Sequence, residues 1–308
     1  MQWWRIVGAV GRFMMRAGAV LLLFVVYQLW GTGLSTGRAQ DRLNREFDQQ
    51  VAEVATTPTT TAPGAPVTAP ADLPVPALGD ALGRITIRSI GSDFLFVQGV
   101  DLKWLRDGPG HFPQTPLPGQ PGNAAIAGHR TTYQAPFNRL DELAPGDTIT
   151  ITTLQGTFTY SVDRHEDEKG AVSGHVIVGP DDVSILEQGV GNRLTLMACH
   201  PKYSAAQRIV VTATLTSNPA PSTPIPTYAD TVTTDASLDS LAGGDPDAWL
   251  PALLWGYATI LVWFGVWFTA RKWKPIPLWA TYVIGTPVVL VLLFLTFENV
   301  ARLLPASY

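Results

Sequence analysis

The chemistry that this sequence could perform is centred on Cys199, the single cysteine among its 308 residues. Cys199 follows an alternating apolar run, 194–198, and precedes His200-Pro201. Because proline ends strand pairing, the thiol is expected at the end of a β-strand. One cysteine excludes an internal disulfide and a cysteine-rich zinc site. The thiol is therefore either a buried apolar group or a nucleophile kept for its reactivity.

Two further residues have the types that would turn this thiol into a catalyst. His129 ends a run of small apolar residues, 124–128, and could help to form the thiolate. Arg208 comes nine positions after Cys199, so a hairpin would place them level, where a guanidinium can hold an oxyanion or a peptide carbonyl. The alternatives are a structural histidine and a surface arginine. His200 is a rival base by adjacency, but neighbouring side chains of a strand point to opposite faces.

Metal binding is the other chemistry that these residue types permit. His129, His200 and Cys199 could supply zinc ligands, but an adjacent Cys-His pair is poorly suited to one ion, and no paired histidine spacing exists. We therefore expect no metal site and no cofactor. His111, in a loop rich in glycine and proline, could line the site without taking part in the reaction.

The elements that must position these residues are mainly β-strands of one globular domain, residues 78–217. Short β-rich runs are separated by turn signals, and only brief helices fit between them. Many short strands with few helices favour a closed or nearly closed barrel. The expected strands are 85–87, 94–97, 124–128, 148–154, 157–165, 176–178, 193–198 and 208–215, and the expected helices are 102–106, 136–143 and 181–188.

Three apolar segments indicate membrane anchoring. The N-terminal run, 17–30, is extended by apolar residues on both sides, and the C-terminal runs 251–270 and 276–297 are each long enough to cross a bilayer. A cleaved signal peptide is the alternative for the first run. The alternative for the other two is a helical hairpin buried in a soluble domain, which their lack of polar residues disfavours.

Basic residues flank these segments in a pattern that sets their orientation. Positively charged flanks stay in the cytoplasm, so the N-terminus and the loop between the C-terminal runs are expected inside, and residues 38–247 outside. The protein is then a multi-pass protein of the cell membrane, with lipid as one partner. The basic residues are Arg5, Arg12, Arg16, Arg271, Lys272 and Lys274.

The chain divides into five expected segments, and its charge excludes one class of partner. A net charge of −4 without a basic stripe argues against nucleic acid binding. Residues 38–53 favour a short helix above the membrane. The segments are a basic start and transmembrane anchor (1–37), an extracellular Thr/Pro-rich tether (38–77), the catalytic barrel (78–217), an extracellular linker (218–248) and two transmembrane helices with a short cytoplasmic loop (249–308).

Several motifs taken together resemble one family, the sortases, and most closely the class E sortases of actinobacteria. The resemblance covers about the whole of residues 78–217. The matching pieces are Gly108-Pro-Gly-His-Phe, Leu117-Pro-Gly-Gln-Pro-Gly-Asn-Ala-Ala-Ile-Ala-Gly-His129-Arg-Thr, Phe137-Asn-Arg-Leu-Asp, Leu143-Ala-Pro-Gly-Asp147, Leu194-Thr-Leu-Met-Ala-Cys199-His-Pro and Gln207-Arg208.

The resemblance implies a mainly β fold, a sortase-type barrel of eight strands, beside the N-terminal membrane helix and the C-terminal membrane hairpin. It implies that His129, Cys199 and Arg208 are the catalytic trio of a cysteine transpeptidase. Such an enzyme cleaves an LPxTG-like or LAxTG-like sorting signal of a secreted protein between Thr and Gly, and transfers the thioacyl intermediate to a peptidoglycan precursor or pilin amine. The expected substrate contacts are Ala198, where the family usually has Thr or Ser, and His200, Thr131 and His111.

Other functions remain open on the sequence alone. Pilin-polymerising sortases often carry a C-terminal span, but their Asp-Pro-aromatic lid is not visible before Ile85, so anchoring of surface proteins is preferred. Cell-wall cysteine hydrolases place the cysteine before the histidine, and L,D-transpeptidases place a glycine beside it; neither order matches. A tethered extracellular binding module with a buried, inert Cys199 is the non-enzymatic alternative.

Overall fold

The computed structural model describes residues 3–56, 73–167, 169–189, 191–228, 244–272 and 277–304. The chain divides into two compact units, one from residues 1–32 with 244–305 and one from residues 33–243. Much of each expected tether, and Lys274 in the expected cytoplasmic loop, lie outside the described residues.

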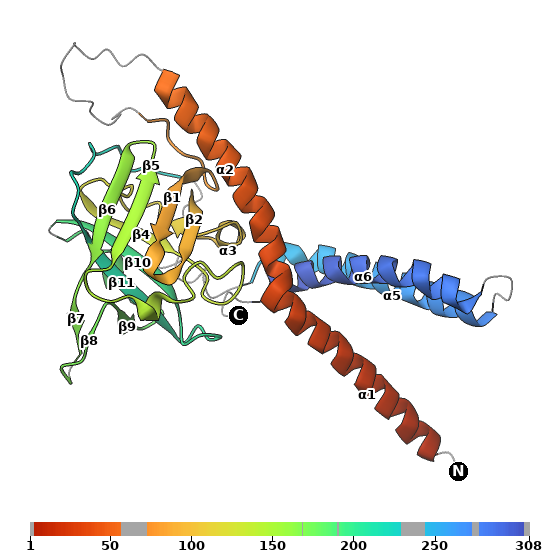
Figure 1. The fold of residues 1–308 in the computed structure, drawn as a ribbon. Helices are drawn as coiled ribbons and strands as arrows, with labels where there is room; N and C mark the ends of the chain where they lie inside the picture. Colours follow the sequence, from red (N-terminus) through yellow and green to blue (C-terminus); the bar gives the residue numbers. More distant parts are fainter. Residues whose placement is uncertain are drawn as a thin grey trace. The chain divides into compact units, whose positions relative to one another are not determined.

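The larger unit contains a β-barrel that closes on itself (Figure 1). Eight strands follow one another in the order β10-β4-β3-β2-β1-β5-β6-β11, and β11 pairs again with β10. Strand β9 adds to β11, and β7 and β8 form a separate ribbon. The eight-stranded barrel expected from the sequence is confirmed. The strands are β1 Ala81–Ile87, β2 Ser92–Gln98, β3 Gly110–His111, β4 Gly122–Ala127, β5 Thr148–Thr153, β6 Gly156–Val162, β7 His165–Glu166, β8 Val172–Ser173, β9 Val176–Val178, β10 Asn192–His200 and β11 Gln207–Leu215.

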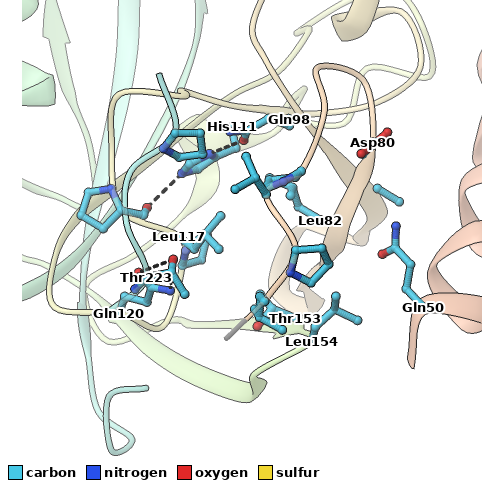
Figure 2. Close-up of a pocket in the computed structure, with 18 of the residues that line it drawn as sticks. Gln50, Asp80, Leu82, Gln98, His111, Leu117, Gln120, Thr153, Leu154 and Thr223 are labelled. Atoms are coloured by element: carbon cyan, nitrogen blue, oxygen red, sulfur yellow. Dashed lines mark hydrogen bonds between the residues drawn. The ribbon is translucent and has the colours of Figure 1, made fainter. Parts of the chain in front are cut away.

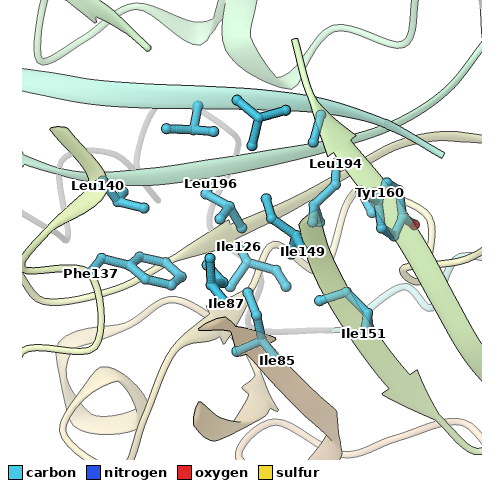
Figure 3. Packing of buried hydrophobic residues seen from close by; sticks show 14 of the residues in the cluster. Ile85, Ile87, Ile126, Phe137, Leu140, Ile149, Ile151, Tyr160, Leu194 and Leu196 are labelled. Atoms are coloured by element: carbon cyan, nitrogen blue, oxygen red, sulfur yellow. The ribbon is translucent and has the colours of Figure 1, made fainter. Parts of the chain in front are cut away.

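Apolar side chains from opposite walls fill the barrel (Figure 3). Strand β5 alternates threonine and isoleucine, so Ile149 and Ile151 are fully buried while Thr150 and Thr152 are half-buried. Ile85 of the neighbouring β1 is paired with Ile151 and is also fully buried. Each such side chain contributes about 1.5–3 kcal/mol relative to leaving it in water. Alternation along the strands therefore decides which face of each strand lines the core.

A long helix, α2 (Thr32–Thr56), packs on the outside of the barrel beside β1 and β2 (Figure 1). Leu43 and Phe47 are buried against the strands. The side-chain amide of Gln40 pairs with the main chain of Leu95: Nε2 donates to the carbonyl at 2.9 Å and Oε1 accepts from the N–H at 2.8 Å. The short helix expected in this region is therefore longer than predicted and is part of the barrel unit.

Two strand pairings bring distant parts of the chain to one end of the barrel. Strand β4 runs parallel to β10, in register from Gly122 opposite Asn192 to Ala127 opposite Met197. Strand β11 is antiparallel to β10 along its whole length, ending with Gln207 opposite His200. The C-terminal ends of β4 and β10 and the start of β11 therefore meet at one rim.

The connections contain less helix than the sequence favoured. Helix α3 (Leu102–Leu105) lies where a helix was expected, but the segments 136–143 and 181–188 contain only the 3₁₀ turns η3 (Leu140–Glu142) and η4 (Val183–Leu186). A further 3₁₀ turn, η2 (Arg88–Ile90), joins β1 and β2. Starting an α-helix is costly, and segments this short do not recover the cost.

The smaller unit consists of apolar helices. It contains α1 (Trp3–Val26), the π-helical segment η1 (Tyr27–Gly31), the 3₁₀ turn η5 (Pro246–Ala248), α5 (Trp249–Lys272) and α6 (Leu278–Leu303). Within this unit the Tyr27 ring packs at 5.2 Å from the Phe294 ring and 5.9 Å from the Phe297 ring, measured between centroids. Three of the described helices are long and apolar enough to cross a membrane, as expected from the three apolar runs.

Candidate active site

Cys199 and Arg208 lie opposite each other on the hairpin formed by β10 and β11. Their Cα atoms are partners in the antiparallel register, which is the register expected from their spacing. Side chains of directly paired residues project from the same face of a sheet. Cys199 is a half-buried free thiol, and Arg208 is buried. The thiol and the guanidinium are therefore neighbours.

His129 reaches the same rim from β4. The N–H of Gly128 donates to the carbonyl of Met197 at 3.0 Å, so parallel pairing continues one residue beyond β4. A Cβ atom on Gly128 would lie 2.5 Å from Cδ2 of Phe137, so only glycine lets the strand end pack this closely on that ring. The close packing fixes the main chain immediately before His129.

The three residues line one small cavity of about 20 Å³. Two of their polar atoms, Nε2 of His129 and Nε of Arg208, are buried without a hydrogen-bond partner in the described structure. Buried polar groups normally have partners, and an orphaned one costs about 1–3 kcal/mol. Free polar atoms beside a thiol are available to a bound substrate. The other lining residues are apolar or small: Leu105, Ala127, Gly128, Met197 and Ala198.

Main-chain carbonyls hold the Arg208 side chain in place. Its Nη1 donates to the carbonyl of Ala205 at 2.9 Å and to that of Gln207 at 3.1 Å. Both acceptors belong to the turn between β10 and β11 or to its end. The guanidinium is thus fixed by one nitrogen while Nε remains free, an arrangement suited to receiving an oxygen atom that gains charge.

Burial keeps the thiol and the imidazole neutral at neutral pH in the unliganded protein. It raises the pKa of Cys199, while the charges of Arg208 and then Arg130 act in the opposite direction. Burial, together with the charge of Arg106, lowers the pKa of His129 from 6.5 to about 4. A thiolate at this site would therefore need a proton acceptor beside the thiol.

Tyr133 covers one side of the imidazole. Its ring centroid lies 4.8 Å from that of His129, with the planes tilted by 40°. Tyr133, Gln134 and Ala135 have φ angles of 53°, 61° and 46°, a left-handed run that costs free energy for residues other than glycine. Nε2 of Gln134 donates to the carbonyl of Gly33 in α2 at 3.0 Å, which helps to hold this loop.

Sequence reasoning treated Arg130 only as a polar neighbour of His129. The structure buries its side chain to 2 % exposure and pairs it with Asp141, at 2.9 Å between Nη2 and Oδ1. The signal in the sequence was an arginine directly after the candidate histidine, with an aspartate in the next matching segment. Burial of a charge so close to the cavity makes Arg130 a functional candidate.

The expected substrate contacts fall in different places. Ala198 lines the cavity with the trio. His200 does not line it, and its Nδ1 instead lies 2.9 Å from Nη1 of Arg130. Thr131 is half-buried and is also absent from the cavity wall. The roles of these residues toward a substrate remain predictions.

His111 lies in a different and larger cavity, of about 360 Å³ (Figure 2). Its Nδ1 is 2.8 Å from Oε1 of Gln98, and its Nε2 is 2.9 Å from the carbonyl of Pro116 and 3.1 Å from Oγ1 of Thr115. Both ring nitrogens are therefore occupied. Leu82, Leu117, Gln120 and Leu154 are among the residues around this cavity in Figure 2.

Within the described ranges, no three His, Cys, Asp or Glu side chains form a group that could hold a metal ion. The chemistry available at the rim is that of a thiol, an imidazole and a guanidinium. Cysteine-dependent acyl-transfer enzymes use such groups, a thiol with an imidazole and a guanidinium around one cavity.

Comparison with known proteins agrees with this class. Residues 85–216 match the family model described as Sortase domain. Sortase SrtE1 of Streptomyces coelicolor is 28% identical over 66% of this chain and 55% of its own length, and Sortase SrtE2 of the same organism is 28% identical over 67% and 80%. A sortase D5 transpeptidase from Clostridium perfringens has 26% identity over 58% of this chain and 99% of its own, with a TM-score of 0.46. Residues 85–216 therefore match a sortase domain, and the chain is similar to class E sortases. The chain spans about half the length of SrtE1.

Proposed function

We propose that this protein is a membrane-anchored sortase that cleaves an LPxTG-like or LAxTG-like signal between Thr and Gly and transfers the new carboxyl end to a cell-wall amine. It is then a cysteine transpeptidase related to the cysteine peptidases. The observation that carries the proposal is the cavity shared by Cys199, His129 and Arg208, with two free polar atoms beside the thiol.

The first half of the reaction forms a thioester. Sγ of Cys199 attacks the threonine carbonyl carbon, and the thiol proton passes to His129 Nε2. The carbonyl oxygen becomes an oxyanion that accepts a hydrogen bond from Arg208 Nε. When the Thr-Gly bond breaks, His129 returns the proton to the departing glycine amine. The products are a thioacyl enzyme and a free peptide with an amino terminus.

The second half transfers the acyl group. An amine of the acceptor attacks the thioester carbon, and the same Arg208 nitrogen supports the second oxyanion. His129 accepts a proton from the amine and gives it to the leaving Sγ, which restores the thiol. A peptidoglycan precursor amine is the proposed acceptor. The overall reaction exchanges one amide bond for another, so it needs no external energy source.

The apolar helices support a fixed location at the membrane. Helix α5 ends with the basic residues Arg271 and Lys272, shortly before α6 begins. Basic segments next to membrane-spanning helices favour the cytoplasmic side. With the basic N-terminus also inside, the barrel unit is placed outside the cell. There it would meet secreted proteins as they leave the membrane.

Cleavage of fluorogenic LAxTG and LPxTG peptides by the full-length protein in detergent tests the proposal. Cys199→Ala should reduce turnover by about 10³-fold or more, because no nucleophile remains. Arg208→Lys should reduce it by about 10²- to 10³-fold, since a point charge cannot reproduce the fixed guanidinium.

Arg193→Lys is the matched control, because Arg193 lies on the same strand β10 but is exposed and remote from the cavity. It should cleave like the wild type. Undiminished cleavage by Cys199→Ala would reject Cys199 as the nucleophile and with it the proposed reaction.

A further inference from the structure

Arg130 is a buried cation whose contacts join the two segments that carry His129 and Cys199. It directly follows His129 in the chain, and its Nη1 donates to the main-chain carbonyl of Cys199 at 3.3 Å. The same nitrogen lies 2.9 Å from Nδ1 of His200, which must be the acceptor and therefore neutral. The side chain of Arg130 thus contacts both the main chain of Cys199 and the imidazole ring of His200.

These contacts begin where the strand ladder stops. Parallel pairing of β4 with β10 ends at Ala127 opposite Met197, and the last main-chain bond runs from Gly128 to Met197. Beyond that point no β4–β10 ladder pair fixes the distance between His129 and Cys199. Two residues further along, the guanidinium of Arg130 provides the next contact between these two segments, at the carbonyl of Cys199.

A second set of contacts anchors the guanidinium from the opposite side. Asn138 Nδ2 donates to the Arg130 carbonyl at 2.7 Å, and Arg130 Nε donates to the Asn138 carbonyl at 3.4 Å. Asp141 pairs with Nη2 at 2.9 Å and lies 3.9 Å from Nζ of Lys202. Burial disfavours the ionised form of Asp141, but the charge and hydrogen bond of Arg130 outweigh it and lower its pKa. The carboxylate therefore neutralises the buried cation at neutral pH.

We propose that Arg130 is a positioning residue for the thiol: its planar guanidinium, held by Asp141, fixes the main chain of Cys199 relative to His129 where the β-ladder no longer does. Arg130 touches neither the cavity nor the reacting atoms, so it acts through Cys199. The inference rests on the proposed function for its effect on turnover. Its effect on the thiol itself does not depend on that function.

Three variants of the full-length protein separate geometry from charge. Arg130→Met removes both, Arg130→Lys keeps a charge that can still pair with Asp141 but loses the fork, and Asp141→Asn removes the anchor. Arg139→Met is the matched control, because Arg139 is exposed and pairs with Glu142 in the same segment. For each, kcat and KM for peptide cleavage, the melting temperature and the pH profile of alkylation by iodoacetamide are measured. The single cysteine makes alkylation report on Cys199 alone.

Arg130→Met should lower kcat by about 10²-fold with KM changed by less than about threefold, because a small misplacement of the nucleophile affects chemistry more than binding. Its alkylation profile should move to higher pH, since a nearby positive charge is lost. Arg130→Lys should keep the alkylation profile near that of the wild type and still lose about 10-fold or more in kcat. The kcat of Asp141→Asn should lie between the values for these two variants. Arg139→Met should match the wild type in kcat and in its alkylation profile.

The proposal is overturned if folded Arg130→Met retains the wild-type kcat and alkylation profile, or if Arg130→Lys restores kcat fully. Should Arg130→Met fail to fold, Arg130→Lys and Asp141→Asn decide, since each retains one half of the ion pair. A wild-type protein that cleaves no sorting peptide would reject the proposed function. A shifted alkylation profile of Arg130→Met would then still show that the side chain of Arg130 acts on the thiol, independently of that function.

Discussion

The described part of the barrel unit contains two buried histidines, which line two different cavities. The two histidines differ in whether their ring nitrogens have hydrogen-bond partners. Burial lowers the pKa of both to about 4. His111 lies in the large cavity with partners at both ring nitrogens. His129 lies in the small cavity with Nε2 unpartnered. The larger cavity is lined by one residue with a buried unpartnered polar atom among the described residues, Gln50, whereas the smaller one is lined by two, His129 and Arg208, beside the thiol.

The difference teaches that cavity volume and a lowered pKa do not by themselves distinguish the two histidines, and that the free ring nitrogen beside the thiol is what favours His129 for the proposed reaction. A satisfied buried histidine stabilises the native structure through its hydrogen bonds. An unsatisfied one lowers stability, and beside a thiol its free nitrogen is available for proton transfer. This contrast makes opposite predictions for the two histidines.

Replacing each histidine by glutamine gives the largest expected effects and tests the contrast directly. His129→Gln should lower kcat/KM for sorting peptides by about 10²- to 10⁴-fold, since the proton carrier is lost, while leaving stability unchanged or raised. His111→Gln should leave cleavage nearly unchanged and lower the free energy of unfolding by about 1–3 kcal/mol. Peptide cleavage and thermal melts on both variants provide the measurements. Equal loss of activity in the two would break the comparison.

Acidification should reveal the property that the two histidines share. The unfolded chain binds a proton near pH 6.5, but each folded histidine does so only near pH 4, so stability falls as the pH drops through this window. Between pH 7 and pH 5 the loss is on the order of 2 kcal/mol per histidine. Tryptophan fluorescence melts at both pH values check this. Each His→Gln variant should lose less stability in acid than the wild type; a variant with an identical acid loss would contradict the cause.

A smaller effect is expected at the polar cluster beside the large cavity. Tyr228 donates to the carbonyl of Pro76 at 2.6 Å and accepts from Nε2 of Gln98 at 2.9 Å, so it joins the segments before and after the barrel. Tyr228→Phe should cost about 1 kcal/mol and lower the melting temperature by roughly 2–4 °C. Tyr203→Phe is the control, because Tyr203 is largely exposed. A loss of cleavage in Tyr228→Phe with normal stability would argue that this cavity takes part in function.

Several features of the fold were predictable because they depend on residues that are close together in the sequence. The strand expected at 148–154 forms β5, and the spacing of Cys199 and Arg208 predicted the register of the β10–β11 hairpin. The helical segments around residues 140 and 184 were over-predicted, since helical composition alone does not show that a segment is too short to nucleate. His111 was expected in a loop that could line the site, but it ends strand β3 and lines the other cavity.

By itself the sequence determined the three apolar helices, the strand-rich domain and the three residue types needed for thiol chemistry, because hydrophobic period and residue identity are local properties. Only the tertiary structure decided that His129 meets Cys199, since the parallel pairing of β4 with β10 joins segments with no shared local signal. It also decided that Arg130 is buried and that two similar histidines have different surroundings. Burial and hydrogen bonding depend on which distant residues pack together, and that information appears only when the barrel closes.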